Sequence, residues 1–266
     1  MPERYTLGHH ESVLRSHRWR TAENSAAYLL PHLKPGMRVL DVGSGPGTIT
    51  IDLATRVFPG HVVGIDASEA VVAEATELAA ERGVTNVEFR VDDAYSPDFT
   101  DGSFDLVHAH QVLQHLGRPI EALAAWRGLV APDGLVAARD CDYEGSIVYP
   151  GSPELTLWLD SYARLARRNG GTPDAGRHLK AWAREAGFTR VEASASVWCF
   201  ENDTDRDWWG GLWADRALES EFATGIAESG IGGPDELAEI RRGWLAWAAD
   251  VDGWMVLPHG EILARG

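Results

Sequence analysis

Cysteine is scarce in this sequence, because its 266 residues contain only Cys141 and Cys199. Two thiols build no disulfide framework, and the chain has no CxxC motif of the kind that binds zinc or exchanges disulfides. Proteins that depend on disulfides work in oxidising compartments. We therefore expect a reduced protein located in the cytoplasm.

Long hydrophobic runs are missing as well. No apolar stretch approaches the roughly 20 residues that a membrane-spanning helix needs. The N-terminal segment MPERYTLGHHESVLRSHRWR contains no apolar core of the kind found in signal peptides. We expect no membrane partner for this chain.

Basic residues are outnumbered by acidic ones. The chain has 24 Lys and Arg residues against 40 Asp and Glu residues, which gives a formal net charge of −16. Proteins that bind nucleic acids need a basic surface to displace counterions from phosphates, so the overall charge argues against a nucleic-acid partner. The basic cluster of Arg15, His17, Arg18 and Arg20 is small enough to serve a single anionic group.

The first half of the sequence alternates regularly between apolar strands and helices. Such alternation favours a parallel sheet covered by helices on both faces. In sheets of this kind a ligand lies outside the carboxyl ends of the strands. The expected strands cover residues 37–42, 61–66, 86–91, 104–110 and 134–139. The expected helices cover residues 10–33, 48–58, 68–83 and 119–130.

The second half is dominated by helices. Two of them are expected at residues 152–169 and 175–186, before a sixth strand at 191–200. Residues 203–254 are expected to be helical and hold most of the tryptophans, and the tail at 259–266 can return as a seventh strand.

A stripe of apolar residues marks one face of the last expected helix. Leu237, Ile240, Trp244, Trp247 and Val251 are spaced by three and four positions. The ordinary interpretation is that this face packs on the core. The functional interpretation is an aromatic wall for a flat or apolar ligand, and both can hold together.

A glycine-rich turn follows the first strand. Gly43, Gly45 and Gly47 indicate backbone in the left-handed region or a ligand closer than a Cβ would allow. The dinucleotide fingerprint G-x-G-x-x-G places its third glycine one position later, which argues against an NAD-dependent oxidoreductase. Asp66, at the end of the second strand, can accept hydrogen bonds from both hydroxyls of a ribose. Asp93, after the third strand, can accept one from an adenine amino group.

Five segments carry a specific resemblance. VLDVGSGPG, GIDAS, FRVDDA, FDLVHAHQVLQHL and LVAPDGLVA follow one another as in the class I S-adenosyl-methionine-dependent methyltransferases. The sequence is most similar to the small-molecule methyltransferases of the ubiquinone/menaquinone-biosynthesis-like group, over about residues 37–140. The resemblance implies an α/β fold with a Rossmann-like seven-stranded methyltransferase sheet, helices on both faces and helical insertions before and after strand six.

The resemblance also implies a cofactor site. The glycine turn would lie against the methionine part of S-adenosyl-methionine, Asp41 would place its ammonium group, and the acids after strands two and three would hold its ribose and adenine. Asp92 stands where many relatives have glycine, which leaves open which carboxylate faces the adenine. The implied residues in this part of the chain are Asp41, Gly43, Ser44, Gly45, Gly47, Asp66, Ala67, Asp92, Asp93 and Ala94.

A shorter resemblance concerns the N-terminal segment. Arg20-Thr21-Ala22-Glu23 is similar to the arginine segment of glycine N-methyltransferases, where the arginine pairs with the cofactor carboxylate. A guanidinium fork suits that role, and the alternative is a solvated helix face. Tyr5 is a further candidate in the same segment.

His110 and Gln111 end the fourth strand, beside the expected position of the methyl group. A histidine there can titrate near neutrality and act as a base, although packing or backbone hydrogen bonding is the alternative. Both residues are also candidates to contact the cofactor. A metal-assisted mechanism would need a carboxylate where His110 stands, so we expect no catalytic metal.

These observations predict an S-adenosyl-methionine-dependent methyltransferase that acts on a small-molecule acceptor, aromatic or quinone-like. The alternatives are a non-catalytic protein that binds the same cofactor, an NAD-dependent oxidoreductase, and a nucleic-acid methyltransferase, whose NPPY-like motif is missing. A homodimer is an alternative to a monomer. The expected parts are an N-terminal helical lid at 1–36, the cofactor domain at 37–200 and 255–266, and a tryptophan-rich cover of the acceptor site at 201–254.

Overall fold

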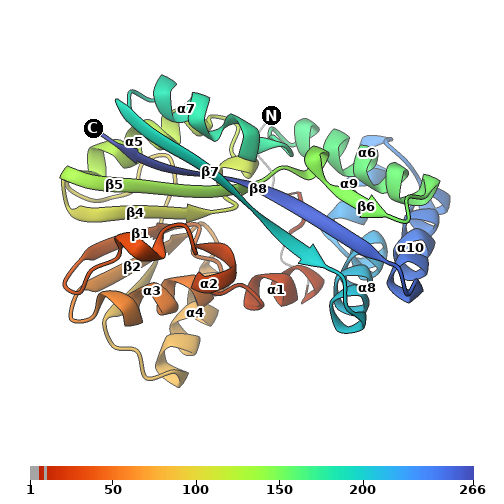
Figure 1. Cartoon of the computed structure of the whole chain (residues 1–266), viewed down its shortest axis with the longest axis horizontal. Coiled ribbons are helices and arrows are strands. Elements are labelled where there is room, and N and C mark those ends of the chain that lie inside the picture. Colours follow the sequence, from red (N-terminus) through yellow and green to blue (C-terminus); the bar gives the residue numbers. More distant parts are fainter. Residues whose placement is uncertain (1–5, 9–10) are drawn as a thin grey trace.

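The computed structural model describes residues 6–8 and 11–266 of the chain. Its centre is one mixed sheet, in which five parallel strands are followed by antiparallel ones in the order β3-β2-β1-β4-β5-β8, with β7 paired along β8 (Figure 1). The parallel strands are β1 (Arg38–Val42), β2 (His61–Asp66), β3 (Val87–Val91), β4 (Phe104–His110) and β5 (Val130–Cys141). The antiparallel strands are β7 (Arg190–Phe200) and β8 (Trp254–Arg265).

The seven expected strands are therefore present, and the methyltransferase-type sheet is confirmed. The sheet carries in addition a three-residue strand, β6 (Ile147–Tyr149), which pairs with the first residues of β8. β5 is also longer than expected, because its two ends pair with β4 and β8 beyond the apolar stretch that predicted it.

Alternate residues of the central strands pack on opposite faces of the sheet, as the pleat requires. From β1, Leu40 and Val42 join one buried cluster, and Val39 joins another that contains Leu53 and Val57. The helices beside the first five strands are α3 (Thr48–Val57), α4 (Glu69–Glu81), α5 (Pro119–Leu129) and α7 (Leu179–Glu185). Short 3-10 turns occur at η1 (Leu30–His32), η2 (Leu113–His115), η3 (Tyr143–Gly145) and η4 (Ala175–His178). Helices therefore cover both faces of the sheet. Side chains that can contact a ligand are expected at the ends of its strands.

The prediction of a single helix over residues 10–33 is wrong. The segment forms α1 (Glu11–Arg18), α2 (Ala22–Ser25) and the turn η1. The break has a local cause, because Thr21 caps α2: its side chain accepts a hydrogen bond from the Asn24 amide, and the Asn24 side chain accepts one from the Thr21 amide. This capping box brings Arg20 to a bend instead of a helix face.

Four helices gather at one end of the molecule, where β7 and β8 extend past the parallel strands (Figure 1). They are α6 (Pro153–Arg168), α8 (Asp203–Glu219), α9 (Glu221–Ser229) and α10 (Pro234–Ala249). Their tryptophans form a buried core with edge-to-face contacts, such as Trp158 against Trp213 at 4.8 Å between ring centroids. No helix within residues 6–8 and 11–266 has the length and apolar character needed to cross a membrane.

The apolar stripe of the last helix packs on this core. Leu237, Ile240, Trp244 and Trp247 are buried, as the ordinary interpretation expects. Val251 does not belong to the stripe, because α10 ends at Ala249 and Val251 is 82% exposed. The buried tryptophans of α10, Trp244 and Trp247, therefore stabilise the fold.

Candidate active site

A cavity of about 330 Å³ opens at the carboxyl ends of β1, β2 and β4. Most of the residues implied by the sequence lie in its wall: Arg20, Asp41, Gly43, Ser44, Gly45, Asp66, Ala67, Asp92, Ala94, His110 and Gln111. Gly47 and Asp93 lie outside that wall, and Tyr5 lies outside the described residues. Segments from five places in the chain thus meet at one site.

The three glycines of the turn serve different purposes. All three have positive φ angles, of 67° at Gly43, 54° at Gly45 and 81° at Gly47. A Cβ on Gly47 would stand 2.7 Å from the Phe89 ring, and one on Gly43 would stand 2.5 Å from the Val112 side chain. These two glycines are required by packing within the protein. A Cβ on Gly45 would meet no described atom closer than 4.0 Å, so Gly45 alone faces open space in the cavity.

Asp66 ties the glycine turn to β2. Its Oδ2 accepts a hydrogen bond from the Gly45 amide at 3.1 Å, and its Oδ1 accepts one from the Ser68 amide at 3.0 Å. A carboxylate oxygen can accept more than one hydrogen bond, so both oxygens retain capacity for a ligand. Asp66 therefore shapes the turn and presents a negative charge to the cavity.

The two neighbouring acids after β3 point to different places. Asp92 lines the cavity, and its oxygens accept hydrogen bonds from the amides of Asp93 and Asp98. Asp93 is exposed and accepts a hydrogen bond from the Tyr95 amide at 2.9 Å. Asp92 is thus the carboxylate at the cavity wall.

Asp41 lies at the floor of the cavity and is only 3% exposed. Its Oδ2 accepts a hydrogen bond from the Thr50 hydroxyl at 2.5 Å, and its Oδ1 lies 2.7 Å from Nδ1 of His108. His108 was missed in the sequence, although it precedes His110 by two positions and therefore shares its face of β4. The carboxylate of Asp41 is held on both sides before any ligand arrives.

Arg20 reaches the cavity from the bend before α2. Its Nη2 donates a hydrogen bond to Oε1 of Gln111 at 2.7 Å. Gln111 has a φ of 55°, and no other non-glycine residue of the described ranges has a positive φ. Such strain persists where the surroundings impose it and is common at functional sites. The bonded pair of Arg20 and Gln111 thus forms part of the cavity wall.

His110 is 5% exposed and lines the cavity. Neither of its ring nitrogens has a hydrogen-bond partner in the part of the chain that the structure describes, and the same holds for the Ser44 hydroxyl. Burial, followed by the positive charges of Arg20 and Arg139, lowers the pKa of His110 well below its ordinary value of 6.5. This shift favours the uncharged ring and argues against titration of His110 near neutrality.

No group of three or more His, Cys, Asp and Glu side chains within the described ranges is arranged to hold a metal ion. The cavity instead combines three carboxylates, from Asp41, Asp66 and Asp92, with one guanidinium, from Arg20. Such a wall suits a ligand that is mainly cationic or rich in hydrogen-bond donors and that also carries one anionic group.

Comparison with known proteins identifies the family to which this chain belongs. The model of a methyltransferase-domain family matches residues 33–200, which is more than half of the chain. The chain belongs to this family of methyltransferases. It is 33% identical over 270 residues to an uncharacterised methyltransferase of Schizosaccharomyces pombe, a match that covers 98% of this chain and 96% of the relative.

Two further comparisons agree with this assignment. The methyltransferase is 30% identical over 177 residues to the ubiquinone/menaquinone biosynthesis C-methyltransferase of Ectopseudomonas mendocina, covering 61% of this chain and 69% of the relative. Its fold matches a phosphoethanolamine N-methyltransferase of Haemonchus contortus solved with S-adenosylhomocysteine, at a TM-score of 0.55 and 19% identity, over 91% of this chain and 52% of that one.

The methyltransferase uses S-adenosyl-L-methionine as its cofactor. The cavity fits that molecule, which carries an ammonium and a sulfonium, ribose hydroxyls, an adenine amino group and a single carboxylate. The buried Ser44 hydroxyl, which lacks a partner among the described residues, offers one more polar group to it. The family assignment removes the NAD-dependent oxidoreductase from the alternatives.

Proposed function

We propose that this methyltransferase transfers a methyl group to a small acceptor, aromatic or quinone-like, that binds beside His110. The supporting observation is a second, smaller cavity of about 10 Å³, which has room for about one water molecule in this conformation. It shares Arg20, Gln111 and His115 with the cofactor cavity. We name it the acceptor chamber.

The acceptor chamber must widen to admit a flat acceptor, because in this conformation it holds about one water molecule, but the residues of its walls suit such a molecule. Three aromatic side chains line it: Tyr143, Trp198 and Trp209. Two amides, Gln111 and Gln114, supply hydrogen-bond donors and acceptors. Aromatic walls with a few polar groups are usual for small-molecule sites. The name of the Ectopseudomonas relative refers to quinones and lends the same class of acceptor some support.

Within the larger cavity we assign one role to each group. The Asp66 carboxylate accepts hydrogen bonds from the ribose, Asp92 faces the adenine, and Asp41 faces the ammonium group. The Arg20 guanidinium binds the carboxylate of the cofactor. Opposite charges at Asp41 and Arg20, and hydrogen bonds from neutral groups to Asp66 and Asp92, would fix the orientation of the cofactor along the strand ends.

The bound sulfonium supplies an activated methyl group, so the chain mainly has to align the acceptor with it. His110 lines the cofactor cavity, and its ring lies 5.7 Å from the ring of Trp198, which lines the acceptor chamber. Its uncharged ring can both donate and accept a hydrogen bond. Because burial lowers the pKa of His110, it is a weak base. We therefore assign it the role of orienting the acceptor oxygen. The acceptor would be acidic enough to lose its hydroxyl proton to solvent, so that the oxygen takes the methyl group and S-adenosylhomocysteine leaves.

The test is a screen of metabolite extracts with S-adenosyl-methionine that carries a deuterated methyl group, read by mass spectrometry. We expect a small aromatic or quinone-like product that gains one labelled methyl. An Asp66→Ala variant should bind S-adenosylhomocysteine about 10–100-fold more weakly and form correspondingly less product. Tight binding of the cofactor with no labelled product from any extract would instead support a non-catalytic protein.

A further inference from the structure

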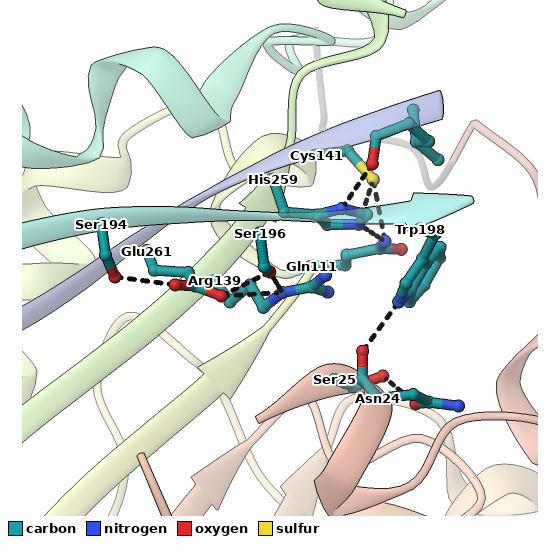
Figure 2. A network of polar contacts seen from close by, with 11 residues as sticks. Asn24, Ser25, Gln111, Arg139, Cys141, Ser194, Ser196, Trp198, His259 and Glu261 are labelled. Atoms are coloured by element: carbon teal, nitrogen blue, oxygen red, sulfur yellow. Dashed lines mark hydrogen bonds and ion pairs between the residues drawn. The ribbon is translucent and has the colours of Figure 1, made fainter. Parts of the chain in front are cut away.

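Two residues of the C-terminal strands contact the Arg20–Gln111 pair. Neither belongs to the five segments that resemble the class I methyltransferases. They are Trp198 of β7 and His259 of β8. Figure 2 shows both side chains beside Gln111, where His259, Gln111 and Cys141 all contact one another. Their contacts decide how Arg20 is presented to the cavity.

His259 determines the orientation of the Gln111 amide. The Nδ1 atom of His259 lies 3.1 Å from the carbonyl oxygen of Leu257, so Nδ1 carries the proton and Nε2 carries a lone pair. Burial and the charge of Arg139 lower the pKa of His259, which keeps the ring in this neutral form. The Nε2 atom of Gln111 therefore donates to Nε2 of His259, at 2.9 Å.

The orientation of this amide has a direct consequence for Arg20. With its NH₂ group turned toward His259 and the sulfur of Cys141, Gln111 presents its oxygen to the Arg20 guanidinium at 2.7 Å. A flipped amide would place two N–H donors against the guanidinium, which has donors only. Since the sulfur is a weak acceptor, His259 is the stronger of the two orienting groups.

Trp198 fixes the backbone that carries Arg20. Its indole N–H donates to the carbonyl oxygen of Asn24 at 2.8 Å, as Figure 2 shows. The Asn24 side chain in turn bonds to the backbone of Trp19 and Thr21, on either side of Arg20. The Trp198 ring also faces the Arg20 guanidinium at 5.7 Å and contacts the His259 ring at 4.4 Å.

A buried ion pair also contacts the Trp198 ring. The guanidinium of Arg139 lies 5.2 Å from the Trp198 ring and 3.4 Å from the Glu261 carboxylate. Glu261 accepts hydrogen bonds from the hydroxyls of Ser194 and Ser196 (Figure 2). Strands β5, β7 and β8 thus hold Trp198 in one position.

We propose that His259 and Trp198 are positioning residues for the carboxylate of S-adenosyl-methionine: His259 orients the Gln111 amide, Trp198 anchors the bend at Arg20, and together they aim the guanidinium into the cavity. This inference rests on the role that the proposed function gives to Arg20. It makes the C-terminal strands part of the cofactor site, although neither residue lines the cofactor cavity.

The test compares two ligands that differ only in the carboxylate. They are S-adenosylhomocysteine and S-adenosyl-3-thiopropylamine, which lacks that group, and binding is measured by calorimetry. Because hydrogen bonds to charged groups contribute about 1.5–3 kcal/mol, Arg20→Gln should weaken S-adenosylhomocysteine by about 10-fold or more and leave the amine unchanged. His259→Phe should weaken S-adenosylhomocysteine by about 5-fold and also leave the amine unchanged.

The controls separate a positioning role from a loss of structure. Val197→Thr changes an exposed neighbour of Trp198 and should alter neither affinity. His259→Gln offers an amide oxygen in place of the imidazole nitrogen and should restore the preference for the carboxylate. Should His259→Phe fail to fold, Trp198→Phe decides the question, because it keeps a ring over Arg20 and removes the bond to Asn24. We expect from it about a 3-fold loss for S-adenosylhomocysteine alone.

Each other outcome has a distinct meaning. If Arg20→Gln discriminates between the two ligands but the variants at 259 and 198 do not, the positioning role is overturned and the cofactor assignment stands. Equal losses for both ligands in His259→Phe or Trp198→Phe would also overturn it, because they would report a general structural defect. If Arg20→Gln does not discriminate, the proposed role of Arg20 and the inference built on it are both overturned.

Discussion

The Asp41 carboxylate and the His108 imidazole form a buried pair in the middle of the sheet, with 2.7 Å between Oδ1 and Nδ1. Both side chains are at most 4% exposed. A buried carboxylate that loses a hydrogen-bond donor retains the cost of its desolvation. His108 is therefore part of the structure that keeps Asp41 ready at the cavity floor.

We expect His108→Leu to lower the free energy of unfolding by about 1–3 kcal/mol, because one oxygen of Asp41 loses its donor. Urea denaturation at neutral pH measures this change. Thr50→Val removes the donor to the other oxygen while keeping a side chain of similar shape, and it should cost a similar amount. A His108→Leu protein as stable as the wild type would show that the Asp41–His108 pair does not contribute to the free energy of unfolding.

Asp92 and Asp93 provide a matched pair for the adenine site. Asp92 lines the cavity and Asp93 does not, so Asp92→Ala should weaken S-adenosylhomocysteine by about 10-fold and Asp93→Ala by much less. Calorimetry on both variants decides between them. The opposite order of affinities would mean that the outer carboxylate turns inward when the ligand binds.

Two glycines of the turn are expected to differ in how much an alanine substitution destabilises the protein. Gly47→Ala should lower the free energy of unfolding by about 2 kcal/mol, because its Cβ would collide with Phe89 at a positive φ. Gly45→Ala meets no such collision and should cost about 1 kcal/mol from backbone strain alone. Urea denaturation of the two variants tests the difference, and equal stabilities would contradict the distinction made for the two glycines.

Asp140 gives the fold a pH dependence. Its Oδ1 accepts a hydrogen bond from the Gln114 amide, while its Oδ2 has no partner in the described part of the chain. Burial raises the pKa of Asp140 from 3.8 to about 7. The protonated form therefore favours the folded state, and this contribution is lost as the pH rises through the interval between the two pKa values.

Asp140→Asn should therefore stabilise the protein more at pH 8 than at pH 4. The Asn oxygen keeps the bond to Gln114, and the variant never has to bury a charge. The gain relative to the wild type should grow between pH 4 and pH 7 and reach about 4 kcal/mol, since each pKa unit is worth about 1.4 kcal/mol. Denaturation of both proteins across this range is the measurement, and a difference that does not vary with pH would refute the prediction.

The sequence predicts the cofactor half of the molecule well because its signals are local. Continuous apolar runs place β1, β2 and β4 within one residue of their observed ends. The glycine turn and Asp92 directly follow a strand and Asp66 is the last residue of one, so their convergence at one edge of a parallel sheet is a consequence of topology. Predicting that the site lies there required no knowledge of side-chain contacts.

The remaining features depend on contacts between distant segments. Trp198 bonds to Asn24 across 174 positions, and His259 meets Gln111 across 148, so no local pattern marks either residue as part of the site. The break in the N-terminal helix is different, because the spacing of Thr21 and Asn24 is a capping signal that the sequence does contain. The position of Val251 outside the stripe follows from the end of α10, a boundary that apolar spacing alone does not define.

The most direct measurement is a crystal structure of this methyltransferase with S-adenosylhomocysteine. The account predicts that the ligand spans the ends of β1, β2 and β4, with its ribose on Asp66, its adenine beside Asp92 and its carboxylate on Arg20, and with its sulfur facing His110 and the acceptor chamber. A ligand bound elsewhere, or bound in this cavity with its carboxylate turned away from Arg20, would contradict it.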